Sequence, residues 1–314
     1  MQIVILSGPG WHTDQLCAAL VERGHTGRVL PYEGLVARLG PAPRGAGSLS
    51  SEQAAILSAD AVLARFIPAG SLEQIVFRVD ALHWIEERGI PVVNSPRTIE
   101  RSVDKFYTDA LLREAGLPTP ETVVCERPAD AMEAIHAMLA RGDEGASAGV
   151  VIKPIFGSMG HGIVRVSDPD VAFRVLQTLE QLRAVFYVQR AVDCGGRDVR
   201  VFVVGGRVLG AIERRAEGGE WRTNVSRGGS ARVFELPPAW ESLALRAAAA
   251  LGAEYAGVDL LPAVDGTVFV LEVNGVPGWQ GLQRATGIDV AGAIVEHLIG
   301  CIGASSRART VQPA

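Results

Sequence analysis

Residues 255–280 read Tyr255-Ala-Gly-Val-Asp-Leu-Leu-Pro-Ala-Val-Asp-Gly-Thr-Val-Phe-Val-Leu-Glu-Val-Asn-Gly-Val-Pro-Gly-Trp-Gln280. Two apolar runs flank the pair Asp265-Gly266, and an Asp-Gly pair in such a setting is a strong signal for a tight turn between antiparallel strands. The stretch therefore predicts a β-hairpin, which the following Gly-Val-Pro-Gly segment ends.

Three polar side chains interrupt these apolar runs: Asp259 on the first strand, and Glu272 and Asn274 on the second. A carboxylate among Val, Leu and Phe costs desolvation energy unless a cation or a donor meets it. Glu272 and Asn274 are two positions apart, so they lie on the same face of their strand. All three offer hard oxygen ligands, which suit Mg²⁺ shared with phosphate oxygens. The alternative is an edge hairpin with solvated carboxylates on its outer face.

Composition indicates a globular protein of more than one domain. The chain has 314 residues, of which 48% are hydrophobic and 21% charged, and this length suggests about two domains. A net charge of -5 and a pI near 5.8 argue against a surface that binds nucleic acid or anionic membranes. The four cysteines form no Cys-x-x-Cys pair, which indicates neither a zinc site nor a disulfide framework and fits a reduced, cytoplasmic protein. We expect no signal peptide and no membrane span.

Apolar periodicity and turn residues outline the elements of the chain. The first hundred residues predict a small parallel α/β domain, with strands at 2–7, 59–66 and 90–94 and helices at 11–23 and 71–88. The remainder predicts helices at 98–114, 129–141, 168–183, 238–251 and 290–302, and strands at 121–125, 150–154, 184–189, 197–204 and 207–214. The last two of these strands are joined at Gly205-Gly206, which predicts a tight hairpin turn.

A lysine and a glycine-rich segment follow one another in the middle of the chain. Lys153 interrupts a β-branched run, which favours an inward or ligand-facing side chain. Gly157, Gly160 and Gly162 then fall within six positions between two strands, so backbone amides there could close over a polyphosphate. This hairpin alone is a weak signal, but the lysine before it supplies the point charge that polyphosphate needs. Lys105, inside a predicted helix, would by itself indicate a solvated surface group.

Arginines concentrate in the third quarter of this acidic chain. They come from two predicted strands and from the loop that follows, and they are Arg200, Arg214, Arg215, Arg222 and Arg227. Such a cluster is either a solvated, salt-bridged face or a grip for planar carboxylates and phosphates. We favour the binding of carboxylates or phosphates, because the segment Ser226-Arg-Gly-Gly offers backbone amides beside the arginines.

Together these motifs resemble those of the ATP-grasp ligases, in order and spacing, from about residue 95 to residue 298. The similar segments are Ser-Val-Asp-Lys105, Val-Ile-Lys153-Pro, Gly157-Ser-Met-Gly160-His-Gly162, Asp198-Val-Arg200, Trp-Arg222-Thr-Asn224-Val-Ser-Arg-Gly-Gly229, Gly-Val-Asp259 and Glu272-Val-Asn274. The Arg-Thr-Asn loop and the tail after Gly278 look most like the RimK-type amino-acid ligases, which include α-L-glutamate ligases. The resemblance implies an α/β fold, in which an N-terminal parallel α/β domain precedes an ATP-grasp fold of two α+β subdomains. The implied parts are an N-terminal domain (1–96), a central subdomain with the glycine-rich loop (97–188), a C-terminal subdomain with the metal site (189–303) and a flexible tail (304–314).

The resemblance also implies an acylphosphate mechanism with ATP and Mg²⁺, for which we expect two ions and Mn²⁺ as a substitute. Lys105 and Lys153 would neutralise the phosphates, and the metal ligands would be Asp259, Glu272 and Asn274. The catalytic residues would be Arg200, Arg214, Arg222 and Asn224, which stabilise the acylphosphate and orient carboxylates. The nucleotide would be bound by Lys105, Lys153, Gly157, Ser158, Gly160, Gly162, Gln189, Arg190, Ala191, Asp198, Arg222, Thr223 and Asn224.

The implied substrates are an amino acid, for which we expect glutamate, and a carboxylate acceptor in the form of a coenzyme, a peptide or a protein C-terminus. The chain departs from the family at residues 188–192, which read Val-Gln-Arg-Ala-Val where an acidic residue commonly lies near the adenosine. The alternatives are a catalytically silent ATP-grasp nucleotide-binding module, or another ATP-grasp ligase such as a glutathione synthase or a D-amino-acid ligase. A silent relative is expected to lose a metal ligand or a lysine, and this chain retains both sets. We also expect a homo-oligomer.

Overall fold

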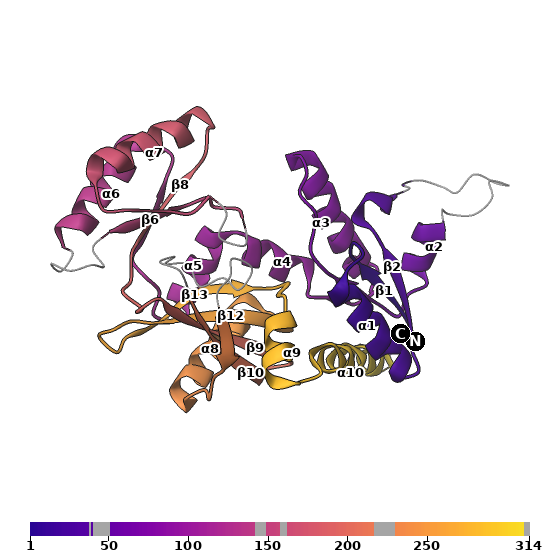
Figure 1. Cartoon of the computed structure of the whole chain (residues 1–314). Coiled ribbons are helices and arrows are strands. Elements are labelled where there is room, and N and C mark those ends of the chain that lie inside the picture. Colours follow the sequence, from indigo (N-terminus) through magenta and orange to yellow (C-terminus); the bar gives the residue numbers. More distant parts are fainter. Residues whose placement is uncertain (38, 40–50, 142–148, 158–161, 217–229, 311–314) are drawn as a thin grey trace.

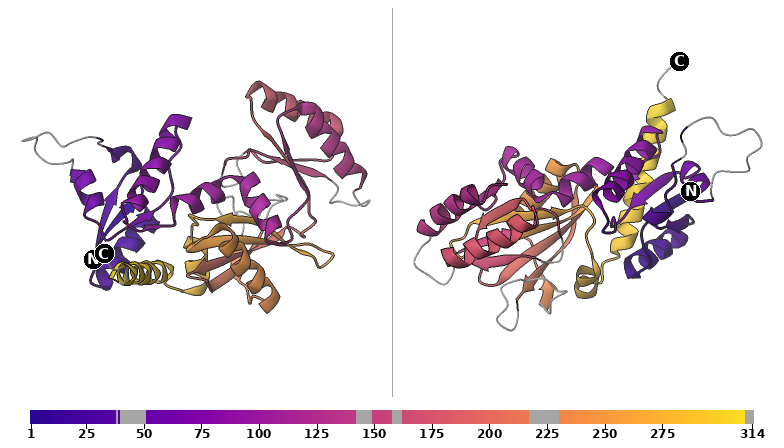
Figure 2. Two further views of the ribbon diagram at one scale, coloured as in Figure 1. Left: turned by 180° about the vertical axis from the view of Figure 1, so that it is seen from behind. Right: turned by 90° about the horizontal axis from the view of Figure 1, so that it is seen from above.

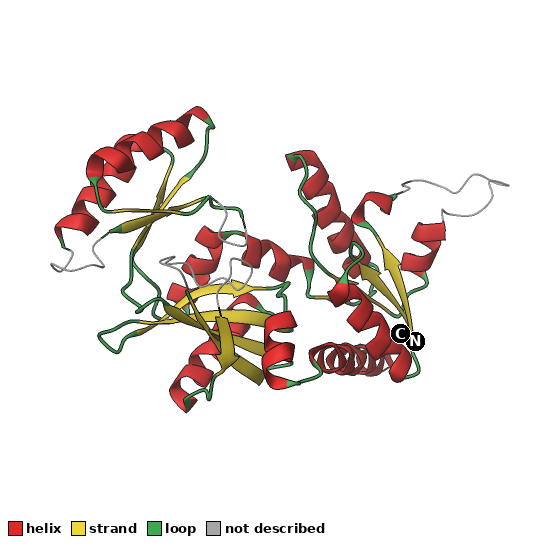
Figure 3. Ribbon diagram, in the orientation of Figure 1, coloured by secondary structure: helices red, strands yellow, loops and turns green. Residues whose placement is uncertain are grey.

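Three β-sheets organise the described part of the molecule, one for each region of the chain (Figures 1 and 3). The computed structural model describes residues 1–37, 39, 51–141, 149–157, 162–216 and 230–310. The strands of the first sheet pair in parallel, whereas those of the second and third sheets pair antiparallel. The α/β fold predicted from the sequence is therefore confirmed.

The first sheet has the order β2-β1-β3-β4. Its elements are β1 (Gln2–Leu6), α1 (Trp11–Glu22), β2 (Thr26–Leu30), the short η1 (Tyr32–Gly34), α2 (Ser51–Leu57), β3 (Ala61–Ala64), α3 (Leu72–Glu87) and β4 (Val92–Val93). The sequence did not predict β2 and α2. In β2 only Leu30 is fully buried, so this edge strand lacks the apolar run that identifies β1 and β3.

The second sheet has the order β5-β8-β6-β7 and is covered by two helices (Figure 1). Its elements are β5 (Thr122–Cys125), α6 (Pro128–Ala140), β6 (Val150–Lys153), β7 (Val164–Val166), α7 (Pro169–Gln181) and β8 (Phe186–Arg190). Ile135 and Leu176 of the two helices pack with Phe186 and Val188 in one buried core. The helices therefore leave the other face of the sheet turned toward the rest of the molecule.

Two helices, α4 (Pro96–Val103) and α5 (Lys105–Glu114), connect the first sheet to the second. The prediction of one continuous helix over 98–114 is wrong. Asp104 has extended backbone angles, and its side chain accepts a hydrogen bond from the amide of Tyr107, so it caps the start of α5. Asp side chains favour such caps over helix interiors, which explains the break. As a result, Lys105 is the first residue of a new helix.

The third sheet, with the order β11-β10-β9-β12-β13, contains the predicted hairpin. Its elements are β9 (Arg197–Val204), β10 (Arg207–Arg215), β11 (Ser230–Val233), α8 (Pro238–Leu251), β12 (Tyr255–Pro262) and β13 (Val268–Asn274). Strands β12 and β13 pair antiparallel, with Asp259 opposite Glu272 and a register shift directly after Asp259. The turn at Gly205-Gly206 has positive φ at both residues (57° and 71°), as a tight hairpin turn requires. The short strand β11 was not predicted.

The chain ends with α9 (Gln280–Thr286) and α10 (Val290–Thr310), and α10 continues beyond the predicted end at residue 302. Ile294 and Leu298 of α10 share one buried core with Leu16 and Leu20 of α1. The last helix therefore packs against the first domain (Figure 2). Of the predicted tail, residues 311–314 lie outside the described part of the chain. Within that part no single helix could cross a membrane by length and composition, although α9 and residues 290–303, bent by 114°, pass such a test as a pair.

Candidate active site

One cavity of about 820 Å³ lies between the three sheets. Side chains from every part of the chain line it. The first domain contributes His12, Arg65 and Phe66; the second sheet and its neighbours contribute Lys105, Lys153, Gln189 and Arg190; the third contributes Asp198, Arg200, Arg214, Asp259, Glu272 and Asn274, with Arg284 on α9. The structure thus brings together the described residues that the sequence singled out, except Gly162 and Arg215, which do not line the cavity. Arg215 pairs with Glu213 instead.

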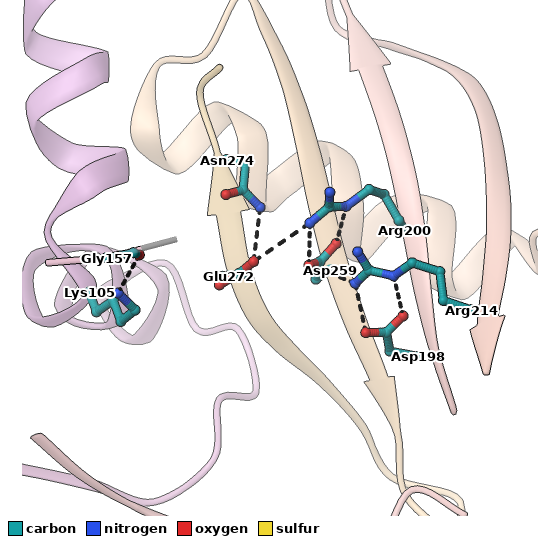
Figure 4. A network of polar contacts seen from close by, with 8 residues as sticks. All are labelled: Lys105, Gly157, Asp198, Arg200, Arg214, Asp259, Glu272 and Asn274. Atoms are coloured by element: carbon teal, nitrogen blue, oxygen red, sulfur yellow. Dashed lines mark hydrogen bonds and ion pairs between the residues drawn. The ribbon is translucent and has the colours of Figure 1, made fainter. Parts of the chain in front are cut away.

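The three predicted metal ligands lie side by side on the hairpin (Figure 4). Asn274 donates from Nδ2 to Glu272 Oε1 at 3.0 Å, as expected for two residues on one face of a strand. Glu272 is partly exposed to the cavity, whereas Asp259 is only 2% exposed. Burial, and after it the charge of Asp259, raises the pKa of the Glu272 carboxyl. The two carboxylates thus repel each other, which favours a cation between them.

Two arginines bind the carboxylate of Asp259. Arg200 donates to both of its oxygens at 2.6 Å, and Arg214 donates to Oδ2 at 2.9 Å while it also grips both oxygens of Asp198 at 2.6 Å. Burial alone would raise the pKa of Asp259, but the charges of Arg200 and Arg214 outweigh it and hold that pKa well below its usual range. These two arginines are therefore already paired with carboxylates of the protein, whereas the sequence favoured their use to bind the carboxylates and phosphates of a ligand.

The residues present fit a magnesium ion. Two carboxylates and one amide oxygen of the kind that Mg²⁺ prefers lie on paired positions of one hairpin. Glu272 Oε1 accepts the amide of Asn274 and contacts Arg200 only at 3.6 Å, and the side chain is partly exposed to the cavity, so an ion can reach this carboxylate. For Asp259 to join them, Arg200 would have to release one oxygen. Arg200 is less buried than Arg214, and its side chain borders the cavity.

The two predicted lysines lie on the other side of the cavity. Lys153 donates to Gln189 Oε1 at 2.6 Å, and its Nζ lies 5.7 Å from the ring centre of Tyr187. Burial lowers the pKa of Lys153 to about 8. Lys105 donates to the backbone oxygens of Gly157 at 2.9 Å and Ile155 at 3.3 Å, and burial lowers its pKa as well. Both are poorly solvated cations, which an anionic ligand would stabilise.

Other predicted nucleotide contacts have partners within the protein. Gln189 is 2% exposed and holds Lys153 on one side and Thr122 on the other, so it positions the lysine. The amides of Arg190 and Ala191 donate to the carbonyls of Glu121 and Gly149. Gly157 and Gly162, which both have positive φ, lie in the segment that connects β6 to β7. The predicted Ser158, Gly160, Arg222, Thr223, Asn224 and Arg227 lie outside the described residues.

Sequence reasoning missed the part of the cavity that the first domain and α9 form. Phe66 is 60% exposed there, and Arg284 is an exposed cation on α9. His12 accepts a hydrogen bond from the amide of Trp279, and burial together with the charge of Arg65 lowers the pKa of His12 to about 4. Arg65 stacks 4.7 Å from the ring centre of Trp279. Trp279 and Arg284 lie in the family-like tail after Gly278, but no motif marks His12, Arg65 or Phe66, because they meet that tail only when the two ends of the chain pack together.

Comparison with known proteins assigns the family. A family model described as the RimK-like ATP-grasp domain matches residues 102–298. A tetrahydromethanopterin:alpha-L-glutamate ligase from Methanosarcina acetivorans is 36% identical over 266 residues, which are 76% of this chain and 79% of that protein. A probable alpha-L-glutamate ligase from Citrobacter koseri is 32% identical over 301 residues, which are 95% of each chain.

Solved structures agree with this assignment. A RimK domain ATP-grasp protein from Sphaerobacter thermophilus superposes with a TM-score of 0.69 at 25% identity and covers 95% of this chain and 99% of that one. The ATP-grasp ligase PsnB, in complex with a minimal precursor, Mg and ADP, shares the fold with a TM-score of 0.69 at 24% identity over 96% of this chain and 98% of that one. The family model spans the cavity residues from Lys105 to Arg284, and the chain therefore belongs to the RimK-like ATP-grasp family of ligases.

Proposed function

We propose that this ligase joins L-glutamate to the carboxylate of an acceptor through an acylphosphate formed with ATP. The observation that carries the proposal is the cavity between the three sheets. Two lysines that suit phosphate groups line one side of it, and the oxygen ligands of the hairpin, which suit a metal ion, line the other (Figure 4). The choice of glutamate is supported by the names of relatives that are 36% and 32% identical to this chain.

The family uses ATP with Mg²⁺, and we assign the nucleotide phosphates to the space between Lys105, Lys153 and the hairpin. When bound, Mg²⁺, for which we propose two ions with Mn²⁺ as a substitute, would neutralise the charge on the phosphate oxygens. Glu272, Asn274 and Asp259 would hold it, and the lysines would bind the phosphates. The segment that begins at Gly157 would cover the nucleotide, and Lys105 would position its first residues through the carbonyl of Gly157.

The acceptor carboxylate would attack the γ-phosphorus and ADP would leave. The glutamate amine would then attack the acyl carbon, phosphate would leave and the amine would lose a proton. Arg200 borders both the hairpin and the open cavity, so it would stabilise the acylphosphate. Arg214 is 5% exposed and bound to Asp198 and Asp259, and it would act by positioning those carboxylates.

We assign the acceptor to the end of the cavity that the first domain closes. The exposed ring of Phe66 offers an apolar face there, and Arg284 offers a cation for a carboxylate. His12, with a pKa of about 4, is neutral at physiological pH and bound to a backbone amide, so it would contribute shape rather than proton transfer.

The test is a phosphate-release screen in which amino acids are combined with pterin or deazaflavin coenzymes, glutamyl peptides and acidic carrier proteins. We expect magnesium-dependent release only when both an acceptor and L-glutamate are present, with the amide product seen by mass spectrometry. A Glu272→Gln variant controls for contaminating ATPases. Release with neutral or D-amino acids but never with acidic ones would refute the glutamate assignment. Magnesium-dependent nucleotide binding by calorimetry, without phosphate release for any pair of substrates, would favour a catalytically silent nucleotide-binding module.

A further inference from the structure

Three metal-ligand side chains gather where α10 meets the third sheet, outside the cavity described above. Glu254 lies between α8 and β12, and His297 and Cys301 are four positions apart on α10. Side chains four apart on a helix share a face. Within the described part of the chain, these three form a group of His, Cys and carboxylate ligands whose binding atoms all lie within 4.8 Å of one another.

The distances between these atoms are close to those of a tetrahedral zinc site. Usual zinc bond lengths place sulfur, nitrogen and oxygen ligands about 3.4–3.6 Å apart. Cys301 Sγ lies 3.5 Å from His297 Nε2 and 4.0 Å from Glu254 Oε2, whereas the nitrogen and the oxygen are 2.6 Å apart. The distance between the sulfur and the nitrogen therefore already fits a zinc site. The other two would follow from a small rotation of the Glu254 side chain, which is 44% exposed.

The ligand chemistry distinguishes this cluster from the magnesium-type site. A thiolate, an imidazole and a carboxylate together suit Zn²⁺, whereas Mg²⁺ prefers oxygen ligands alone. Three protein ligands would leave a fourth position for water. A second cavity of about 530 Å³, lined by His297, Cys301, Gly300 and Arg207 among others, gives solvent access to that position. It shares no lining residue with the main cavity.

The turn between β9 and β10 holds two of the ligands in place. Gly205 donates its amide to the carbonyl of Glu254 at 2.8 Å. The His297 ring rests against the same glycine so closely that a Cβ on Gly205 would lie 2.6 Å from Nδ1. Nδ1 therefore faces the turn, and Nε2 faces Glu254 and Cys301.

We propose that Glu254, His297 and Cys301 bind one Zn²⁺ ion, with water as the fourth ligand, and that this ion links α10 to the start of β12. The Cys301 thiol gives its proton to solvent when the ion binds, and no electron is transferred. Because α10 also packs against α1, the ion would tie the first domain to the third sheet. The alternative is an ion pair of His297 with Glu254 in which Cys301 takes no part. The test therefore follows the thiol of Cys301, which binds the metal ion only if the proposal holds.

The experiment titrates Co²⁺, a spectroscopic substitute for Zn²⁺, into the reduced, metal-free full chain. We expect one equivalent to produce tetrahedral visible bands and a thiolate-to-cobalt absorption. Cys301→Ser should remove the thiolate band and lower Zn²⁺ affinity, measured against a chromophoric chelator, by at least about tenfold. The matched control Cys125→Ser, in a half-buried cysteine of the second sheet, should change neither. A wild-type spectrum without a thiolate band, or one that survives Cys301→Ser, would overturn the proposal.

A second pair of variants tests the site without touching a ligand. Gly205→Ala and Gly206→Ala both place a side chain at positive φ (57° and 71°), so they strain the turn alike. Only the methyl group at Gly205 would collide with the His297 ring, because the space beside Gly206 is open. We expect Zn²⁺ affinity to fall by about tenfold or more in Gly205→Ala alone. Equal affinities in the two variants, with both folded by circular dichroism, would contradict a site built on His297.

Discussion

At the scale of single residues, the carboxylates of the hairpin differ in what holds them. Asp259 is buried and compensated by two guanidinium groups, whereas Glu272 is partly exposed, accepts the Asn274 amide and lies 3.6 Å from Arg200. Removal of Asp259 would leave Arg200 and Arg214 short of a partner, and an uncompensated buried charge costs about 3–5 kcal/mol. Loss of turnover in an Asp259 variant would thus mix loss of metal with loss of stability. Glu272 is the better position for a test.

We predict that Glu272→Gln lowers magnesium-dependent turnover by at least about a hundredfold, because it removes a carboxylate charge from the metal site. The amide can still accept the hydrogen bond from Asn274, so the melting temperature should stay close to that of the wild type. The control is Asp265→Asn in the turn of the same hairpin, where the side chain only caps the amide of Thr267. Turnover near the wild-type rate in Glu272→Gln would refute its assignment as a metal ligand.

A second prediction concerns Lys153 and the pH dependence of stability and of nucleotide binding. Its pKa of about 8 lies below the ordinary 10.5 because burial disfavours the ammonium. Between these values the unfolded chain holds more protons, so the contribution of Lys153 to stability rises with pH across that window. A bound polyphosphate favours the ammonium instead, so nucleotide binding should take up a proton, and nucleotide affinity should fall as pH rises through about 8.

Calorimetry near pH 8.5, about half a unit above that pKa, in two buffers of different ionisation enthalpy measures this uptake. In Lys153→Arg, which stays charged, the uptake should vanish, whereas Lys105→Arg should keep it. Equal proton uptake by wild type and Lys153→Arg would show that the proton goes elsewhere.

At the scale of elements, the break between α4 and α5 sets the position of Lys105. Asp104 accepts the amide of Tyr107 and starts α5, and Lys105, the first residue after it, reaches the carbonyl of Gly157. The Asp104 cap therefore positions Lys105 in the cavity as well as starting α5.

We predict that Asp104→Ala lowers the free energy of unfolding by about 1 kcal/mol and also weakens nucleotide binding. Asp168→Ala is the matched control, because Asp168 caps α7 in the same way at a distance from the cavity. That variant should lose similar stability and keep its nucleotide affinity. Chemical denaturation and nucleotide titration measure the two effects. The same loss of affinity in both variants would mean that the cap acts through stability alone.

At the scale of the whole molecule, Asn94 fastens the first domain to the hairpin. It is fully buried at the end of β4. Its amide nitrogen donates to the carbonyls of Tyr255 and Gly275, and its oxygen accepts the amides of Glu254 and Tyr255. Tyr255 begins β12 and Gly275 directly follows β13, so one side chain ties both ends of the hairpin to the first sheet.

We predict that Asn94→Ala lowers the free energy of unfolding by about 2–4 kcal/mol, since it leaves buried backbone groups without partners. Gln283→Ala, which removes another contact between regions but only one hydrogen bond, to Gln15, should cost about 1 kcal/mol. Urea unfolding measures both. If the two variants lose the same stability, Asn94 does not fasten the domains as described.

Features that depend on near neighbours along the chain could be predicted from the amino-acid sequence. The hairpin at 255–280 followed from an Asp-Gly turn between apolar runs, and the Gly205-Gly206 turn from the need for positive φ. The α/β class and the family also followed, because family motifs are short runs of residues. Edge strand β2 and the break at Asp104 were missed, since weak apolar patterns and a single capping residue do not stand out from the sequence around them.

The contacts between side chains that are distant in the sequence became known only from the folded structure. It paired Arg200 and Arg214 with Asp259 and Asp198, so two arginines that the sequence favoured as ligand-binding groups are largely compensated within the protein. It placed α10 on the first domain and brought Cys301 and His297 to Glu254, although the cysteine spacing had indicated no zinc site. The physical reason is that local pattern reports the conformation of a segment, whereas ion pairs and ligand sets depend on atoms within a few ångströms, and packing sets those distances.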